Sequence, residues 1–173
     1  MPARRGVFVG LGANLDDPPT QIRAALAALE ALPGTRVLRA SRLYSSPAWG
    51  PVAQQDYVNA ACELETVLTP DELLAQLLAI ERALGRDRSV ARYGPRRIDL
   101  DLLADGESTL DAPGLRIPHP HLAERAFVLV PLAEIAPAQR IPGHGEVHML
   151  LAQLDRDDRR RVQPLGVDGT QGE

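Results

Sequence analysis

The sequence of 173 residues predicts an α+β protein in which helices pack on an antiparallel sheet. Three observations support this fold class. Apolar residues alternate with period two over 98–102, which is typical of a half-buried strand. Apolar residues recur at helical spacing over 19–32 and again after Thr69. The predicted elements follow one another as strand, helix, strand, strand, helix and strand, with short mixed elements after them.

The chain is expected to form a single domain. Its length fits one compact unit, which we assign to residues 1–154, and a hydrophobic content of 45% is ample for a core. Residues 155–173 are charged and then rich in glycine, so we expect a largely disordered C-terminal tail.

The first half of the chain contains three predicted strands and one helix. Residues 6–11 form a buried strand, and the helix that follows begins at a cap on Asp16 or Asp17 and stops at Pro33-Gly34. Residues 35–44 and 57–66 are further strands, and the segment between them is a loop because it is rich in Pro, Gly and Ser.

Two glycines near the N-terminus need an explanation. Gly10 and Gly12 resemble the beginning of a dinucleotide-binding fingerprint, but Leu15 stands where the third glycine would fall. We therefore reject that site and expect the glycines to form a tight turn or to allow close backbone packing.

The second half begins with a helix and a strand. Thr69 is the expected cap, with Glu72 in the capping-box position, and Gly85 ends the helix. After the strand at 98–102, Asp105-Gly106 is a hairpin signal. A short strand at 115–117, a rigid turn at 118–121, a short helix near 124–125, an apolar segment at 127–132 and a helix at 146–154 complete the chain.

Composition excludes several function classes. The chain contains no lysine, so its 19 basic residues are all arginine, and a P-loop lysine or a Schiff-base lysine is impossible. The formal net charge of −4 argues against a generic nucleic-acid binder. Cys62, the single cysteine, lies in an apolar run, which predicts a buried, inert thiol and a reducing, cytoplasmic compartment. No apolar run is long enough to span a bilayer.

The stretch 86–103 carries the clearest chemical signal. Asp99 and Asp101 alternate with aliphatic residues, so both carboxylates should lie on one face of a strand. Neighbouring carboxylates repel each other unless a cation lies between them, and Mg²⁺ prefers carboxylates with phosphate oxygens and water. Because five arginines precede the pair, the pattern favours a metal–polyphosphate site, although a solvated basic loop before an ordinary strand is the alternative.

Other residues are weaker candidates. Trp49 lies in the loop at 45–56, which either closes over a ligand or tucks back against the fold. Asn59 is a polar residue in an apolar strand, where its amide could bind a ligand or cap a sheet edge. His144 with His148, and His119 with His121, are spaced poorly for zinc, so metal ligation is the less favoured interpretation.

Several segments together match a known family. They are GLGANL at 10–15, SSPAWG at 45–50, DYVNAACELET at 56–66, IERALGR at 80–86, RYGPRRIDLDLL at 92–103, IPHP at 117–120 and ERAFVLVPLAEIAP at 124–137. In this order and spacing, the chain resembles the 6-hydroxymethyl-7,8-dihydropterin pyrophosphokinase family of folate biosynthesis.

The resemblance implies a ferredoxin-like α+β fold and transfer of diphosphate from ATP to the hydroxymethyl oxygen of the pterin, with AMP leaving. It implies catalytic roles for Arg86, Arg96, Asp99 and Asp101, with two Mg²⁺ ions held by both aspartates. Positions matching ATP contacts are Arg88, Arg92, Tyr93, Ile98 through its backbone, Arg116, His119 and Arg125. Positions matching the pterin site are Ser46, Pro47, Trp49, Tyr57, Asn59 and Phe127.

Tyr93 stands where the family often has tryptophan, and Arg116 falls in a variable segment. Glu81 lies at a position that the family uses near the site. Trp49 and the arginine segment correspond to two mobile loops whose closure would exclude water.

The primary hypothesis is therefore an active, monomeric, cytoplasmic enzyme whose partners are its small-molecule substrates, with no nucleic acid and no membrane. One alternative is an RNA-binding module, but the acid pair would repel the phosphates of the RNA in the absence of metal. Another alternative is an inactive relative, although the charged core of the site is intact.

Overall fold

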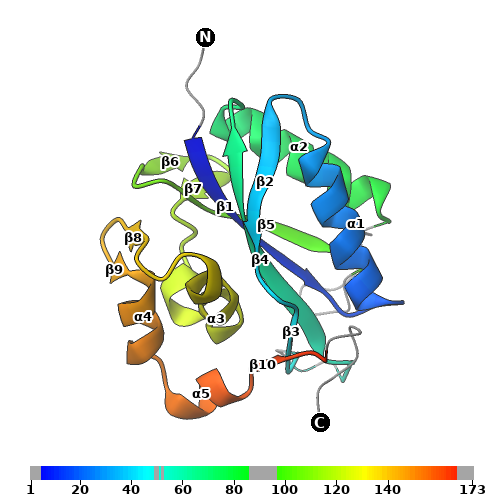
Figure 1. Ribbon diagram of the computed structural model, residues 1–173, viewed down its shortest axis with the longest axis vertical. Coiled ribbons are helices and arrows are strands. Elements are labelled where there is room, and N and C mark those ends of the chain that lie inside the picture. The colour runs from blue at the N-terminus through cyan, green and yellow to red at the C-terminus, as the bar shows by residue number, and fades with distance from the viewer. Residues whose placement is uncertain (1–4, 49–50, 52, 86–96, 167–173) are drawn as a thin grey trace.

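The computed structural model describes residues 5–48, 51, 53–85 and 97–166 of the 173-residue chain. An antiparallel sheet lies at its centre (Figure 1). β1 (Arg5–Ala13) runs between β4 (Tyr57–Thr66) and β5 (Asp99–Asp105). The other edge of β4 pairs first with β2 (Thr35–Ala40) and then with β3 (Tyr44–Ser46). The predicted antiparallel sheet with packed helices is thus confirmed.

Two amphipathic helices cover one face of the sheet. α1 (Pro18–Glu30) begins at Asp17, whose carboxylate accepts a hydrogen bond from Thr20 N, and α2 (Pro70–Ala83) begins with the predicted capping box of Thr69. Alternate strand residues enter the same core as these helices: Val7, Val9, Leu11, Leu64, Leu100 and Leu102. Period-two alternation therefore determines which side chains the helices bury.

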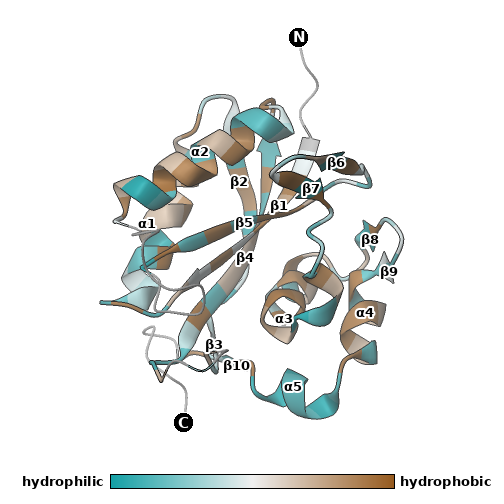
Figure 2. Cartoon of the chain, turned by 180° about the vertical axis from the view of Figure 1, so that it is seen from behind, coloured by the Kyte–Doolittle hydropathy of each residue, from teal (hydrophilic) through white to brown (hydrophobic). Residues whose placement is uncertain are grey.

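The opposite face is covered by a second group of helices. α3 (Ala126–Ile135) follows the 3₁₀ turn η1 (Leu122–Glu124) and packs with α4 (Val147–Gln153) over Phe8 and Leu103. Figure 1 shows α1 and α2 on one side of the sheet and α3 and α4 on the other. The apolar segment predicted at 127–132 is thus part of a helix (Figure 2), and Val128, Leu129, Pro131 and Leu132 of this segment are buried.

Two small hairpins complete the body of the chain. β6 (Leu110–Ala112) pairs with β7 (Leu115–Ile117), and β8 (Arg140–Ile141) pairs with β9 (Gly145–Glu146). The first hairpin leads through the turn at 118–121 into η1. It therefore brings the two histidines of that turn towards the end of α3.

The predicted disordered tail is wrong for residues 155–166. α5 (Arg156–Arg160) begins at Asp155, and β10 (Gln163–Pro164) pairs with β3. Val162 is 6% exposed and joins a small cluster with Tyr44 and Ala126. Backbone pairing and apolar burial thus order a segment that is mostly polar in sequence, while 167–173 lie outside the described residues.

The strand predicted at 35–44 is interrupted. Ser41 N donates to Ala61 O at 2.8 Å, while the Ser41 hydroxyl accepts from Ala61 N at 2.9 Å, so a side chain replaces a backbone acceptor on the edge of β4. The chain bends here and continues as β3.

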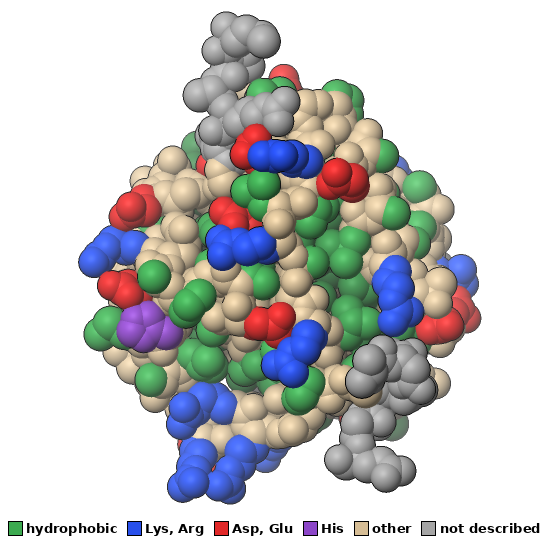
Figure 3. Space-filling model, viewed as in Figure 1, with side chains coloured by type: hydrophobic (Ala, Val, Ile, Leu, Met, Phe, Trp, Pro, Cys, Tyr) green, Lys and Arg blue, Asp and Glu red, His purple; other side chains and the backbone are tan. Residues whose placement is uncertain are grey.

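The surface carries mixed charge. On the face seen in Figure 3, acidic and basic side chains are interspersed, and arginines gather over α5. Among the residues that the structure describes, no helix combines the length and the apolar character needed to cross a bilayer.

Candidate active site

A cleft of about 460 Å³ opens on the sheet face that carries α3. α3 covers the part of this face around Phe8 and Leu103, and the cleft lies where the sheet continues past the first turn of the helix. Its lining comprises Gly10, Leu11, Gly12, Ser46, Pro47, Tyr57, Asn59, Ala60, Asp99, Asp101, His121, Glu124, Arg125, Phe127 and Val128.

The floor of the cleft is the bare backbone of β1. Gly12 pairs with Asp99 on one side and with Asn59 on the other, and Gly10 pairs with Asp101. A Cβ atom on Gly12 would lie 3.2 Å from Asn59 Nδ2, which is tighter than ordinary contact. Neither glycine forms the turn considered from the sequence. Gly12 instead leaves room for the amide of Asn59, whereas a Cβ atom on Gly10 would lie 3.4 Å from the side chain of Leu103.

The two carboxylates share one face of β5, as predicted. Asp99 and Asp101 are half-buried in the cleft lining, whereas Leu100 between them is 5% exposed and packs under α2. At the outer edge of β5, the backbone N–H of Leu100 donates to Oε2 of Glu81 at 2.8 Å. Glu81 is itself 1% exposed, so a buried carboxylate holds the backbone that carries the acid pair.

The opposite wall presents an amide and two aromatic rings. The hydroxyl of Ser46 donates to Asn59 Oδ1 at 2.5 Å, and both side chains are 4% exposed. This bond orients the amide and directs its NH₂ group away from Ser46. Tyr57 and Phe127 line the cleft from β4 and α3, so flat apolar surfaces flank a hydrogen-bonding amide.

The residue that follows β1, Asn14, fixes the segment that leads into this wall. Asn14 is 1% exposed, and its amide donates to Gln54 Oε1 at 2.7 Å and to Gln55 O at 2.9 Å. These bonds tie the strand that forms the floor to the segment that leads into Tyr57.

His119 lies close to the cleft without lining it. Burial, followed by the charges of Arg125 and His121, lowers the pKa of His119 to about 4, while Asp99 opposes this shift. The imidazole is therefore neutral at pH 7, and its Nδ1 accepts a hydrogen bond from His121 N at 3.1 Å. Arg125 places its guanidinium carbon 5.6 Å from the centre of the Phe127 ring.

The structure brings most of the described candidates together. The predicted residues that line the cleft are Ser46, Pro47, Tyr57, Asn59, Asp99, Asp101, Arg125 and Phe127. Arg116 is not among them, because its exposed side chain pairs with Asp111 at 3.4 Å. Ile98 is fully buried, so a ligand could use only its backbone. The remaining candidates lie outside the described residues: Trp49, Arg86, Arg88, Arg92, Tyr93 and Arg96.

Sequence reasoning missed some residues of the site. His121 and Glu124 line the cleft, with His121 Nδ1 3.2 Å from Glu124 Oε2. Their spacing of three fits one helical turn, but polar residues at that spacing are common on any surface. The bond from Leu100 to Glu81 joins two segments 19 residues apart and leaves no sequence pattern.

The donor set fits Mg²⁺ only with help from a ligand. Among the described residues there is no group of three or more His, Cys, Asp and Glu side chains that could hold a metal ion. Two carboxylates facing an open cleft are nevertheless the protein share that Mg²⁺ takes when phosphate oxygens and water complete its octahedron.

The fold and the site define a small α+β enzyme whose paired carboxylates face a flat binding slot. The sequence profile of the 7,8-dihydro-6-hydroxymethylpterin-pyrophosphokinase (HPPK) family matches residues 8–137. The chain belongs to this family. It is a transferase that moves a pyrophosphoryl group to hydroxymethyldihydropterin in folate synthesis.

Named relatives agree with this assignment. The chain is 49% identical to the 2-amino-4-hydroxy-6-hydroxymethyldihydropteridine pyrophosphokinase of Pseudomonas aeruginosa over 84% of its length and 90% of the relative. It is 45% identical to the enzyme of the same name from Methylorubrum extorquens over 90% of its length and 98% of the relative.

Solved structures agree at the level of the fold. The Plasmodium falciparum HPPK-DHPS A437G/K540E protein with pterin and p-hydroxybenzoate superposes with a TM-score of 0.75 at 13% identity. This chain spans less than half of that longer one, 48%, while 96% of this chain is covered. The wild-type protein with pteroate gives a TM-score of 0.68, with 87% of this chain and 42% of that one covered.

Proposed function

We propose that the enzyme takes its pyrophosphoryl group from ATP and that the cleft holds the pterin ring between Tyr57 and Phe127. Asn59 reads the polar edge of the ring, because its amide offers both a donor and an acceptor in a buried wall. The observation that carries the proposal is the pairing of Gly12 with both Asn59 and Asp99. A flat substrate bound at the amide is separated from the carboxylates only by β1, the strand that lies between β4 and β5.

The reaction is a displacement at the β-phosphorus of ATP. The hydroxymethyl oxygen of the pterin forms a bond to this phosphorus, and the bond between the β-phosphorus and the bridging oxygen to the α-phosphate breaks. AMP leaves with the bridging oxygen, and the hydroxyl proton passes to solvent. The products are AMP and the pterin diphosphate. The chain contributes by holding the oxygen and the phosphorus in line, which removes much of the entropic barrier.

Asp99 and Asp101 are the residues that would hold two Mg²⁺ ions beside the triphosphate. Bound there, the ions would neutralise phosphate charge and polarise the attacked phosphorus. The support is the donor set itself, two carboxylates on one strand face at an open cleft. The same aspartates would repel the triphosphate if no cation were present.

Arginine must supply the remaining positive charge, because the chain has no lysine. By their match to the family pattern, we assign Arg86 and Arg96 to the moving diphosphate. We assign ATP contacts to Arg88, Arg92, Tyr93, Ile98, Arg116, His119 and Arg125. Arg125 has direct support, since it lines the cleft beside Phe127. Trp49 would cover the pterin, and Ser46 and Pro47 would contact its edge.

We also propose that the core is ferredoxin-like. The supporting observation is the neighbour order β2, β4, β1, β5 in an antiparallel sheet, with α1 and α2 on one face. We propose that residues 1–154, together with the ordered segment at 155–166, form the single catalytic domain and that the chain acts as a monomer in the cytoplasm. Cys62 is a buried free thiol, which fits a reducing compartment. The large hydrophobic side chains exposed among the described residues, Leu38 and Met149, are isolated.

The test is a direct assay with 6-hydroxymethyl-7,8-dihydropterin, ATP and Mg²⁺, in which AMP and the pterin diphosphate are separated by chromatography. We expect AMP and product in equal amounts, and neither without pterin or without Mg²⁺. ATP binding without AMP formation would contradict the activity, and product formation after complete removal of divalent cations would contradict the metal assignment. Light scattering during size-exclusion chromatography tests the monomer.

A further inference from the structure

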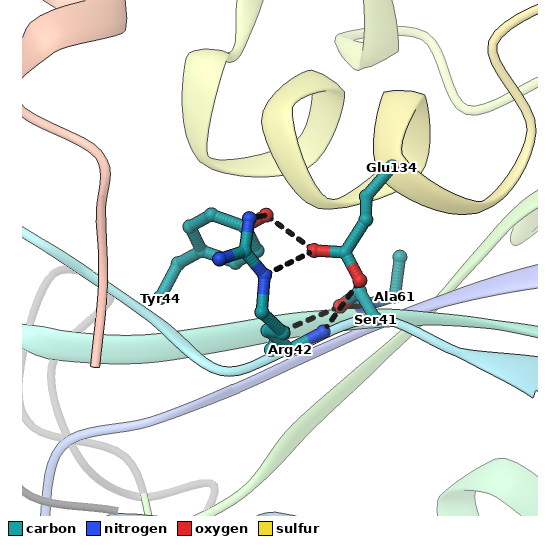
Figure 4. A network of polar contacts seen from close by, with 5 residues as sticks. All are labelled: Ser41, Arg42, Tyr44, Ala61 and Glu134. Carbon is teal, nitrogen blue, oxygen red and sulfur yellow. Dashed lines mark hydrogen bonds and ion pairs between the residues drawn. The ribbon is translucent and has the colours of Figure 1, made fainter. Parts of the chain in front are cut away.

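A network of polar contacts joins the two walls of the cleft at a distance from the cleft itself. Glu134 projects from α3 towards the bend between β2 and β3 (Figure 4). Its Oε2 accepts from the backbone N–H of Arg42 at 2.9 Å, and its Oε1 accepts from Arg42 Nε at 3.1 Å and from the Tyr44 hydroxyl. One carboxylate thus binds the backbone and two side chains of the segment that begins β3.

The network is bound to the main sheet as well. The Ser41 hydroxyl donates to Arg42 O at 2.7 Å and accepts from Ala61 N at 2.9 Å, which fixes the bend to β4. The guanidinium of Arg42 also donates to the Tyr44 hydroxyl at 3.3 Å. The bend, the ring and the helix are therefore connected through shared partners rather than through isolated pairs.

The protonation states suit this arrangement. Burial opposes ionisation of Glu134, but hydrogen bonds from Tyr44 and Arg42 outweigh it and hold the pKa of the carboxyl below its usual value. Burial, followed by the contact with Glu134, raises the pKa of the Tyr44 hydroxyl. At neutral pH the phenol therefore donates to a carboxylate, which is the stronger form of this hydrogen bond.

Tyr44 and Glu134 each lie on the same element as a residue that lines the cleft. Tyr44 and Ser46 lie two residues apart on β3 and share one strand face. Glu134 and Phe127 lie seven residues apart on α3, which is about two turns, and share one helix face. Contact at one end of this pair of elements therefore sets the separation at the other end, where Ser46 and Phe127 both line the cleft.

Apolar packing runs parallel to the polar contact. Tyr44 is 4% exposed and forms a buried cluster with Ala126 and Val162, against which Phe127 packs. The Tyr44 ring thus belongs to the apolar cluster on which Phe127 packs, while the Tyr44 hydroxyl donates a hydrogen bond to Glu134. The two effects can be separated by experiment because Tyr44→Phe removes only the hydroxyl.

We propose that Glu134 and Tyr44 are positioning residues for the pterin, and that their hydrogen bond holds Phe127, which stacks on the ring, in a fixed position relative to Ser46, which orients Asn59. The inference rests on the proposed placement of the pterin between Tyr57 and Phe127. It adds a specific role for two residues that do not line the cleft and that act through their neighbours.

The test compares Tyr44→Phe, Glu134→Gln and the double variant with the unaltered chain. Equilibrium dissociation constants are measured separately for 6-hydroxymethyl-7,8-dihydropterin and for ATP with Mg²⁺, well below the unfolding midpoint. Each single variant is expected to weaken pterin binding about fivefold, which is less than the full effect of one lost charge-assisted hydrogen bond because the network acts on the pterin through its neighbours. ATP binding should stay unchanged, and the double variant should be no weaker than the worse single one because both changes weaken the same contact.

Glu65→Gln is the matched control. Glu65 has a side-chain exposure of 25%, against 27% for Glu134, and it also pairs with an arginine, but it lies near the far end of β4 from the cleft. It should leave both dissociation constants unchanged. If Glu134→Gln does not fold, Tyr44→Phe still decides the question, because the ring remains in its apolar cluster.

Two outcomes would overturn the inference. A lowered unfolding midpoint with unchanged pterin affinity would assign the network a purely structural role, and equal weakening of pterin and ATP would indicate general loosening. Failure of the proposed placement is distinguishable, because then Phe127→Ala in the cleft itself would also leave pterin binding unchanged.

Discussion

The backbone N–H of Leu100 donates to the carboxylate of Glu81 at 2.8 Å, at the outer edge of β5. Leu100 stands between Asp99 and Asp101, so the bond fixes the backbone at the midpoint of the acid pair. β5 lies at one edge of the described sheet, where no further strand satisfies this N–H. The side chain of Glu81, on α2, therefore supplies the hydrogen-bond acceptor that a neighbouring strand would otherwise supply.

Glu81→Leu should lower stability and activity together. The change keeps an apolar volume under the sheet but leaves the Leu100 N–H buried without this acceptor, which costs about 1–3 kcal/mol. Because the backbone of the acid pair is then free to shift, we expect the Mg²⁺ concentration needed for half-maximal turnover to rise. Denaturant unfolding and a Mg²⁺ titration of AMP formation measure the two effects.

Glu81→Gln is the partner variant, because an amide oxygen can still accept from Leu100. It should retain most of the stability. Equal losses of stability in Glu81→Leu and Glu81→Gln would show that the charge of Glu81, and not the bond to Leu100, is what matters.

Asp99→Asn and Asp101→Asn should each reduce turnover to about one thousandth or less, since each removes a charged oxygen ligand from a site that must offset phosphate charge. Folding should be retained because both side chains lie in the cleft lining rather than in the core. The assay is AMP formation at saturating ATP and Mg²⁺. Asp71→Asn, in the exposed first turn of α2, is the control. Full turnover in either cleft variant would refute the metal assignment.

Gly12→Ala should weaken pterin binding about tenfold while ATP binding changes less. The added Cβ would meet Asn59 Nδ2 at 3.2 Å and displace an amide that Ser46 holds in place. Gly6→Ala on the same strand is the control. Its Cβ would meet the carboxylate tip of Glu63 at 3.0 Å, and a flexible side-chain end can move away at little cost. An unchanged dissociation constant for the pterin in Gly12→Ala would argue against the proposal that Asn59 binds the polar edge of the pterin.

Local patterns predicted the parts of the site that depend on local spacing. The period-two alternation around Asp99 and Asp101 is a property of one strand, so it placed both carboxylates on one face. The capping box at Thr69 is equally local. Resemblance to a family, rather than any pattern, indicated that Asn59 and Phe127 share a site, because the two residues come from different elements.

Contacts between distant segments were the ones that sequence reasoning missed. β10 is ordered by β3, more than a hundred residues earlier in the chain, and its two residues carry no strand signal of their own. The bond between Tyr44 and Glu134 spans 90 residues. Gly10 and Gly12 stand out in the sequence, but only the strand register of the structure places them opposite Asp101 and Asp99.

His119 should make stability depend on pH between about pH 4 and pH 6.5. Burial, with the charges of Arg125 and His121, lowers its pKa from 6.5 to about 4 in the folded chain. Between these values the unfolded chain binds a proton that the folded chain does not, so the free energy of unfolding falls as pH falls through this window. The half-buried ring is partly screened by solvent, so we expect a contribution of about 1–2 kcal/mol.

The measurement is denaturant unfolding at several pH values from 7 down to 4, with His119→Asn beside the unaltered chain. Asn can accept the hydrogen bond from His121 N that Nδ1 now accepts at 3.1 Å, yet it does not titrate. His119→Asn should therefore lose less stability than the unaltered chain over this window. The control His144→Asn, at an exposed turn between β8 and β9, should lose as much stability as the unaltered chain. Parallel pH profiles for His119→Asn and the unaltered chain would mean that His119 is protonated as readily in the folded as in the unfolded state.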